Sequence, residues 1–318
     1  MMIPSLALAL LLQSPEEYLR RGDYAKAVEA LESAERAHPG ADPEVYVMLA
    51  VAKSNLNDPE GAAAACEKGL ERFPRSQRIA SYYVALLAPV QLEAALARYP
   101  ENPVIERELG GFLLDSRKDD PRTEGLLASA RRQMSKDAAA QYQYGRWACL
   151  HQKEEVCVEA LQAALVLTPH ENAAARVLIN GMVGVAEDRM SHPAQARAAF
   201  EQAMAAYRNL EPPVADVPYQ YVRWLLDRSE DVQARKVNSE IRERNPAFSA
   251  AHLEEARFLF RESKTAASIA EANLALKNAG ADETQLRAIH SFLAKTYVSA
   301  GQADNAAPHR DWLEAHPQ

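Results

Sequence analysis

Residues 137–169 of this 318-residue chain read DAAAQYQYGRWACLHQKEEVCVEALQAALVLTP. Two stretches with the apolar spacing of amphipathic helices flank a polar break at residues 152–154. Gly145 follows a large residue, Tyr144, in the first stretch. Pro169 ends the second stretch, because proline cannot continue a helix. The segment therefore predicts a helical hairpin whose two helices approach closely at a small residue.

The same pattern recurs along the chain at a nearly constant interval. Pro39 and Pro74 lie 35 residues apart, and the 69 residues from Pro100 to Pro169 make two such intervals. Small residues recur at the matching position of the expected first helices: Ala50, Gly110, Gly145, Gly184, Ala256 and Ala294. Small residues also precede a larger one by four positions in the expected second helices, as Ala196 precedes Phe200. The chain is therefore built from repeats.

This set of residues resembles the tetratricopeptide repeat signature, L-G-x2-Y, then A-x3-F, then P, over about 34 residues. The resemblance covers nearly the whole chain after residue 13. It implies an all-α fold, a right-handed α-solenoid of about eight to nine helical hairpins. It also implies a non-catalytic scaffold or adaptor that binds protein or peptide partners in the concave groove of the superhelix. An alanine-rich chain with no alternating strand pattern agrees with an all-α fold.

The domain organisation follows from the apolar N-terminus and from the prolines. Residues 1–13, MMIPSLALALLLQ, predict a signal peptide, because Ser14-Pro15-Glu16-Glu17 has the form of a capping box that starts a new helix. The alternative is that residues 1–13 belong to the first repeat and the protein is cytoplasmic. A first repeat array is expected over 14–208 and a second over 219–318, joined by a proline-rich connection at 209–218. The protein is therefore expected to be exported, to the periplasm or the outside of the cell.

Charge and motif content argue against several function classes. A net charge of −8 with interspersed signs disfavours nucleic-acid binding, and the apolar run is too short for a stable membrane span. Asp119-Asp120 precedes Pro121, which favours a solvated turn over a metal-binding helix. We expect no catalytic residues, no metal site and no cofactor. The alternative is an all-α enzyme or ligand-responsive regulator with a small-molecule pocket in the superhelix.

The candidate binding residues lie on the first helices of the repeats. In tetratricopeptide families the residue after the small packing position points into the groove, which implies that role for Arg146, Arg223, Arg257 and Lys295. Tyr142, Tyr219 and Phe260 are expected on the same face. Arginine forks bind carboxylates in bidentate fashion, so the expected partner is an acidic segment or a C-terminal carboxylate. The alternative is that these cations only pair with nearby acids on a solvated helix.

The cysteines leave one question open. Cys149 and Cys157 are expected near the facing ends of one hairpin, where a disulfide is geometrically accessible in an exported protein. The alternative is that both are small buried apolar residues. The partner, the pathway and the oligomeric state cannot be inferred from these patterns.

Overall fold

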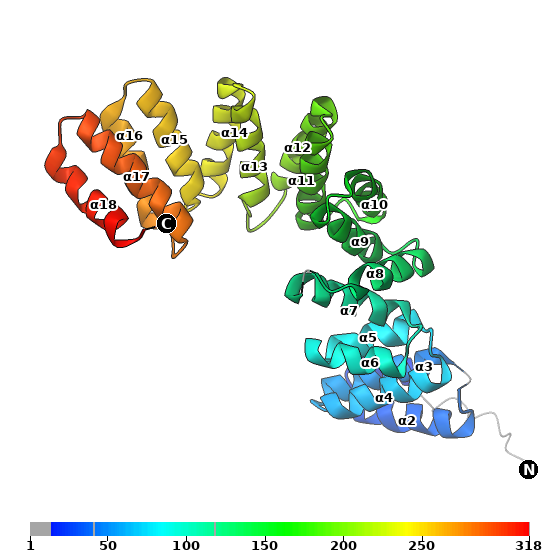
Figure 1. The fold of residues 1–318 in the computed structure, drawn as a ribbon. Coiled ribbons are helices and arrows are strands. Elements are labelled where there is room, and N and C mark those ends of the chain that lie inside the picture. The colour runs from blue at the N-terminus through cyan, green and yellow to red at the C-terminus, as the bar shows by residue number, and fades with distance from the viewer. Residues whose placement is uncertain (1–13, 41, 118, 318) are drawn as a thin grey trace, which may run out of the picture. The chain divides into compact units, whose positions relative to one another are not determined.

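The computed structural model describes residues 14–40, 42–117 and 119–317. Regular structure in this part of the chain consists of helices, which confirms the all-α prediction. The chain divides into two compact units, residues 1–152 and 153–318 (Figure 1). Each unit is a stack of helical hairpins.

Over its described residues, 14–40, 42–117 and 119–152, the first unit contains four hairpins and one further helix. Its helices are α1 (Pro15–Arg21), α2 (Tyr24–Ala37), α3 (Pro43–Asn55), α4 (Pro59–Arg72), α5 (Gln77–Leu86), the short 3-10 helix η1 (Pro89–Gln91), α6 (Leu92–Arg98), α7 (Pro103–Ser116), α8 (Arg122–Gln133) and α9 (Ala138–Leu150). Within this unit each helix packs mainly on its neighbours along the chain, so the core is a continuous seam between hairpins.

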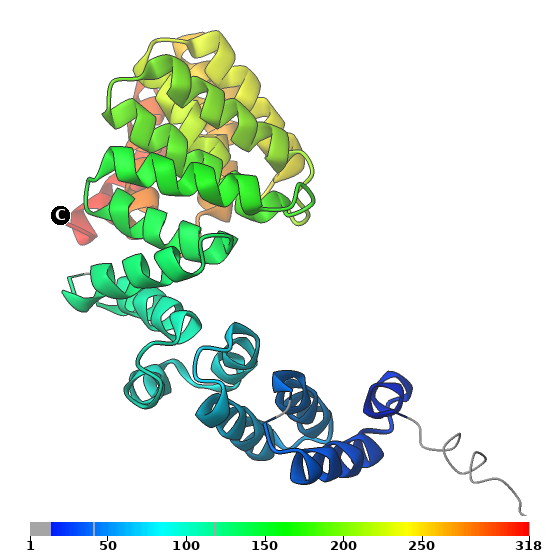
Figure 2. The same ribbon diagram turned by 90° about the vertical axis from the view of Figure 1, so that its right-hand side faces the viewer.

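The second unit is built in the same way (Figures 1 and 2). Its helices are α10 (Glu154–Leu167), α11 (Ala173–Arg189), α12 (Pro193–Tyr207), α13 (Asp216–Asp227), α14 (Asp231–Arg244), α15 (Ser249–Arg261), α16 (Thr265–Asn278), α17 (Glu283–Ser299) and α18 (Ala303–Ala315). The most extensive helix contacts in this unit join α11 with α12 and α15 with α16, the two helices of one hairpin in each case.

Caps and prolines fix where several helices begin. The side chains of Asp42, Asp58 and Asn102 accept hydrogen bonds from backbone N–H groups of the first turn of α3, α4 and α7. A proline follows each of these caps, at the position where the missing N–H costs nothing. A helix also begins at Pro15, as predicted, but the Ser14 side chain makes no capping hydrogen bond to the backbone. Proline at the first helical position therefore defines that start without the predicted capping box.

The turns within hairpins share one backbone feature. A residue with positive φ follows the first helix of several hairpins: Gly22, Asn57, Ser191, Ser229, Ser263 and Gly301. At Ser229 the following residue, Glu230, then donates its N–H to the carbonyl of Leu225, which closes the end of α13. The chain can therefore reverse within three or four residues and bring the second helix against the first.

Small residues lie where helices pack closest. A Cβ atom on Gly110 would lie 2.6 Å from Cδ2 of Leu127 on α8, and one on Gly184 would lie 3.0 Å from the ring of Phe200 on α12. Gly69 of α4 faces Tyr46 of α3 in the same way, at 2.8 Å from its Cβ. The predicted close approach at Gly110 and Gly184 is therefore present, within hairpins.

The predicted domain organisation differs from the division of the structure into two compact units. The predicted signal peptide, residues 1–13, lies outside the described residues. The predicted connection at 209–218 lies inside the second unit, and the division between the compact units falls at 152/153. The connection is also shorter than expected, because α13 already begins at Asp216. Pro218 fits there because the first turn of a helix does not use its N–H groups in intrahelical bonds.

None of the helices in the described part of the chain combines the length and the apolar content that crossing a membrane requires.

A pair of glycine substitutions tests the close helix contact. Gly69→Ala places a methyl group against the Tyr46 Cβ, which is tied to the backbone of α3, and we expect a loss of about 1–3 kcal/mol in the free energy of unfolding. Gly125→Ala is the matched control, because that position on α8 has no atom within 4 Å of the new methyl group. It should stabilise the protein by about 1 kcal/mol through helix propensity. Urea unfolding measures both, and equal shifts in the two variants would contradict the packing.

Candidate functional site

The seven residues predicted to bind a partner divide between the two units. Tyr142 and Arg146 lie on α9 in the first unit. Tyr219, Arg223, Arg257, Phe260 and Lys295 lie on α13, α15 and α17 in the second unit. The five in the second unit lie on the first helices of three hairpins, α13–α14, α15–α16 and α17–α18.

In the first unit Arg146 is held by its neighbours. Its Nη2 lies 2.5 Å from Oδ1 of Asp115 on α7, and its Nη1 donates to the Gln143 side chain at 2.9 Å. The guanidinium also lies 5.7 Å from the ring centre of Tyr142. Arg146 therefore follows the alternative that the sequence left open, in which the cation pairs with a nearby acid.

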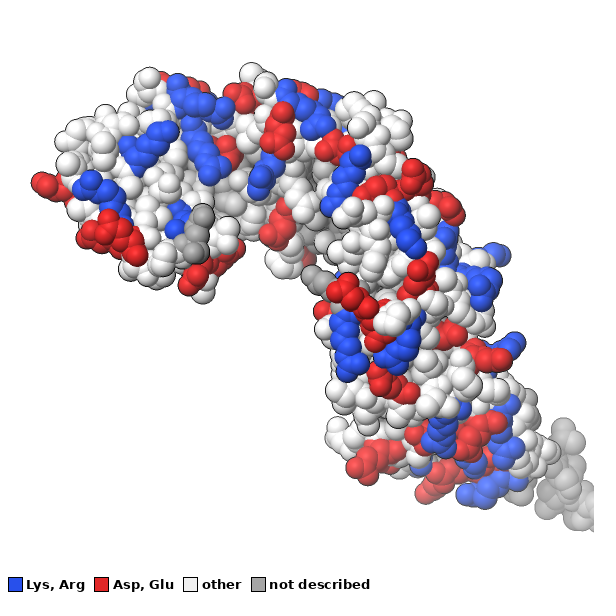
Figure 3. Space-filling view, viewed as in Figure 1, with Lys and Arg blue, Asp and Glu red and all other residues white. Residues whose placement is uncertain are grey.

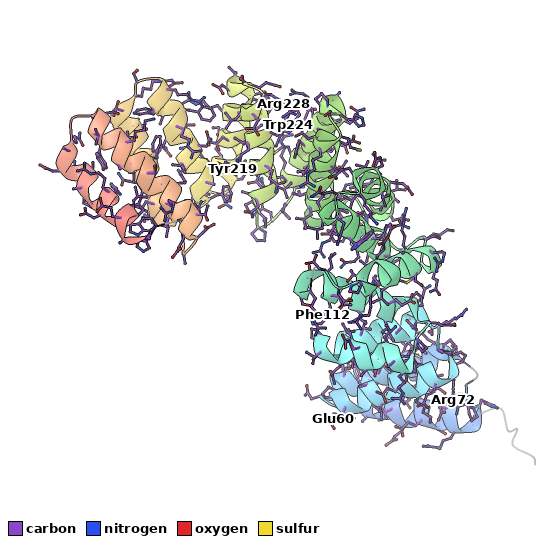
Figure 4. The ribbon with its side chains drawn as sticks, in the orientation of Figure 1. Glu60, Arg72, Phe112, Tyr219, Trp224 and Arg228 are labelled. Carbon is purple, nitrogen blue, oxygen red and sulfur yellow. The ribbon has the colours of Figure 1, made fainter. Side chains whose placement is uncertain are left out.

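The second unit contains a groove on its first helices, which we call the α15 groove. It has a volume of about 450 Å³ and is lined by Leu226, Asp231, Glu254, Arg257, Phe260, Arg261, Phe292 and Lys295. Three of the predicted residues therefore line one groove: Arg257, Phe260 and Lys295. Tyr219, labelled on α13 in Figure 4, belongs to the same unit, and its hydroxyl donates to Glu254 of the groove.

A buried carboxylate anchors one side of the α15 groove. Glu254 is 3% exposed, and its Oε2 accepts a hydrogen bond from Arg257 at 2.9 Å and from the Tyr219 hydroxyl at 3.5 Å. Burial, with a smaller contribution from the Glu254 charge, raises the pKa of Tyr219 to about 12. The tyrosine therefore stays protonated at neutral pH and donates to the carboxylate. Glu254 thereby neutralises the charge of Arg257 and fixes its position.

The apolar part of the groove is an aromatic pair. The rings of Phe260 on α15 and Phe292 on α17 lie 5.9 Å apart with an interplanar angle of 76°, an edge-to-face contact. Both side chains are partly exposed, and Leu226 of α13 lines the same groove. This surface can accept an apolar side chain without any rearrangement of the three helices.

Two of the predicted cations are not neutralised. Arg223 and Lys295 are exposed, and neither makes an ion pair with another of the described residues. The groove itself holds three cations, Arg257, Arg261 and Lys295, against two anions, Asp231 and Glu254, which leaves one positive charge in excess. Arg261 is paired with Asp231 at 2.9 Å, so Lys295 is the groove cation that remains open to a ligand.

Charge over the rest of the second unit is mixed. Figure 3 shows basic and acidic side chains interspersed over the face in view. Arg235 and Arg242 of α14 both contact Glu255, and Arg242 also contacts Glu271 of α16. These side chains therefore form ion-pair networks between helices, and they do not create a single-sign patch for nucleic acid.

The remaining motifs take the following positions. Asp120 lies in the turn before α8 and accepts hydrogen bonds from the backbone and guanidinium of Arg122, which confirms the predicted turn. Cys66 is a buried thiol whose pKa is raised to about 12 by burial, whereas Cys149 and Cys157 are disulfide-bonded. Within residues 14–317, leaving out 41 and 118, no group of three or more His, Cys, Asp or Glu side chains is placed to hold a metal ion.

Sequence reasoning missed five of the eight residues that line the groove. These are Leu226, Asp231, Glu254, Arg261 and Phe292. Glu254 precedes Arg257 by three positions on one helix, a spacing that brings side chains together, so this pair was accessible from the sequence. Phe292 precedes Lys295 by three in the same way. Leu226 and Arg261 have no such signal, because their place depends on how α13, α15 and α17 pack.

Comparison with known proteins gives a family match for part of the chain. Residues 18–88, which run from α1 to the end of α5, match the family model described as tetratricopeptide repeat. No curated protein matches the chain in sequence.

Solved structures match over a longer range. A chain of the APC/C hetero-tetramer Cut9–Hcn1 aligns with a TM-score of 0.51 at 15% identity, over 93% of this chain and 56% of that chain. Yeast Tom70 aligns with a TM-score of 0.48 at 17% identity, over 93% of this chain and 56% of that chain. The tetratricopeptide protein YrrB aligns with a TM-score of 0.44 at 16% identity, over 64% of this chain and 98% of its own. The chain thus spans little more than half of the Cut9–Hcn1 chain, and the likeness concerns the fold.

The contact between buried Glu254 and partly exposed Arg257 in the α15 groove predicts a non-additive response to mutation. Arg257→Gln leaves the Glu254 carboxylate buried with only the distant Tyr219 hydroxyl, and should cost about 1–3 kcal/mol. Adding Glu254→Gln should recover most of that loss, because no buried charge then remains. The control Arg261→Gln breaks a pair whose two side chains are both about half exposed, and should cost under about 1 kcal/mol. Urea unfolding of the four variants measures the coupling, and simple additivity of Arg257→Gln and Glu254→Gln would contradict it.

Proposed function

Since the chain is a tetratricopeptide repeat protein, we propose that it is a non-catalytic scaffold that binds a protein or peptide partner. The observation that supports this proposal is the α15 groove, which combines an apolar aromatic floor with an open cation, Lys295. The aromatic floor and Lys295 come from α15 and α17, both first helices of hairpins, and their side chains are partly or fully exposed. A partner segment could therefore lie along them without displacing any core residue.

The chemistry of the groove favours an extended segment with a large apolar side chain next to a carboxylate. The apolar side chain would contact Leu226, Phe260 and Phe292, and the carboxylate would pair with Lys295. Arg223, on the neighbouring α13, would extend the cationic track. The carboxylate could belong to an acidic side chain or to the C-terminus of the partner. Arg257 lines the groove but would not supply a free charge to the partner, because Glu254 already neutralises it.

We also propose that the protein works after export. Residues 1–13 have the apolar composition of a short signal peptide, and a helix begins directly after them at Pro15. The disulfide-bonded state of Cys149 and Cys157 fits an oxidising compartment, where such bonds persist. The partner would then belong to the cell envelope or to the outside of the cell.

Charge reversal in the groove tests the proposed binding surface. The probe is an array of peptides of equal length that carry an aromatic residue followed by an acidic, a neutral or a basic residue, each with a free or an amidated C-terminus. We expect the acidic and free-carboxylate peptides to bind best, and Lys295→Glu with Arg223→Glu to weaken them at least about tenfold, the equivalent of one charge-assisted contact. Fluorescence anisotropy at low and high salt measures the affinities.

The matched control for charge reversal is Lys236→Glu, an exposed lysine on α14, the second helix of its hairpin. This variant should bind like the unmodified protein. Peptide affinities that are unaffected by Lys295→Glu and Arg223→Glu would remove the groove from the proposal. Binding of small molecules in place of every peptide would favour the alternative, an enzyme or ligand-responsive regulator.

Intact mass of the endogenous protein tests export. We expect a chain that lacks about the first 13 residues, a leader slightly shorter than the usual length of about 15 to 30 residues. Its mass should rise by two hydrogen atoms on reduction and unfolding, because Cys149 and Cys157 are disulfide-bonded while Cys66 is free. A full-length chain with three reduced cysteines would place the protein in the cytoplasm.

A further inference from the structure

Two histidines face each other across the hairpin formed by α17 and α18. Nδ1 of His290 on α17 lies 3.0 Å from Nδ1 of His309 on α18. A hydrogen bond at this distance requires one ring to donate its Nδ1–H and the other to accept with an unprotonated Nδ1. The contact therefore depends on at least one of the two nitrogens carrying no proton.

A stack of aromatic rings surrounds this pair. His290 lies parallel to Trp312 of α18, with ring centres 4.3 Å apart and an angle of 4°. Trp312 also stacks on His316, whose ring centre lies 4.1 Å away at an angle of 12°. The ring of Tyr297 on α17 stacks on His309 at 5.7 Å. The five rings thus join α17 to α18 over two turns of each helix.

Burial makes this cluster sensitive to protonation. His290 is 9% exposed, and burial lowers its pKa, with smaller contributions from His309 and His316. Burial also lowers the pKa of His309. The titratable side chains that act on His290 are His309 of α18 and His316, the residue after α18. Helix α16 reaches the cluster through Asn273, whose side-chain amide donates a hydrogen bond to the Tyr297 hydroxyl. None of these contacts supplies a carboxylate that would stabilise a charged imidazole.

We propose that His290 and His309 form an acid-sensitive latch that holds α18 on α17. The first proton taken up by the pair can bind at Nε2 of the donor ring, where it leaves the Nδ1–H···Nδ1 bond intact. The second proton can bind only at the accepting Nδ1. It thereby breaks the Nδ1–H···Nδ1 hydrogen bond and leaves two positively charged rings side by side. That second step releases the latch. The inference does not depend on the proposed partner groove.

The sign of the pH dependence follows from the lowered pKa of both rings. The folded hairpin favours neutral histidine, so the latch contributes its full stability above the ordinary histidine pKa of about 6.5 and loses it as the pH falls below that value. This stability is lost because the two histidines bind protons in the unfolded chain at a pH where they remain neutral in the folded hairpin. Acid therefore opens α18 first at this cluster, and α17, which supplies Phe292 and Lys295 to the α15 groove, loses its support on that side.

Hydrogen exchange of the full chain tests the latch. Exchange of α18 amides is compared with that of α16 amides at pH values about one and two units above and below 6.5, after correction for the intrinsic rate, with EDTA present so that no metal bridges the two rings. We expect the protection of α18 to fall about tenfold for each unit of pH below the transition, while α16 changes much less. Equal pH dependence of α18 and α16 would overturn the latch.

Two variants separate the latch from a general acid effect. His309→Gln keeps a hydrogen-bonding side chain but removes one of the two titrating rings, so the protection of α18 should depend less steeply on pH, with only the contribution of His290 remaining. His170→Gln, at an exposed histidine in the turn before α11, should keep the full pH dependence. A histidine NMR titration of the unmodified protein adds a readout that needs no variant: His290 and His309 should titrate below the ordinary histidine pKa of about 6.5. Titration of both rings at or above about 6.5 would contradict the proposal.

Discussion

The structure depends on one steric constraint, the close approach of two helices at a side chain small enough to allow it. Gly110 against Leu127 and Gly184 against Phe200 show the constraint within hairpins. A single hairpin cannot bury both of its apolar sides, so each must stack on the next, and stability becomes a sum over neighbouring interfaces. The groove lies where such stacking leaves Phe260, Phe292 and Lys295 of the first helices partly or fully exposed.

Much of the fold could be predicted from local rules. The polar break at residues 152–154 predicted the end of α9 and the start of α10, and proline after a capping Asp or Asn marks the starts of α3, α4 and α7 in the same local way. These features are readable because cap, turn and proline effects act within a few residues. The helical start at Asp216 was missed, because a proline-rich segment was taken as non-helical throughout although the first turn of a helix tolerates proline.

The candidate site was less accessible for a physical reason. Spacing along a helix places Arg257, Phe260 and Lys295 on first helices, and the structure brings all three to one groove. Spacing does not predict which of the cations are left without an acidic partner. Arg146 meets Asp115 from 31 positions away, and Arg257 meets a carboxylate that burial keeps from solvent. Ion pairing between repeats depends on packing angles. The sequence could therefore predict the candidate cations, but not that Lys295 is the groove cation without an acidic partner.

The hairpin turns have a consequence for how the chain reaches its native state. Helix contacts within each unit join elements that are neighbours, or near neighbours, along the chain, and a single left-handed residue such as Ser229 closes the turn between them. A chain with such local contacts pays little loop-closure entropy before each new contact forms. Folding can therefore nucleate at whichever hairpin forms first and spread to both sides. The order of assembly is then a matter of hairpin stability, and no single repeat is an obligatory starting point.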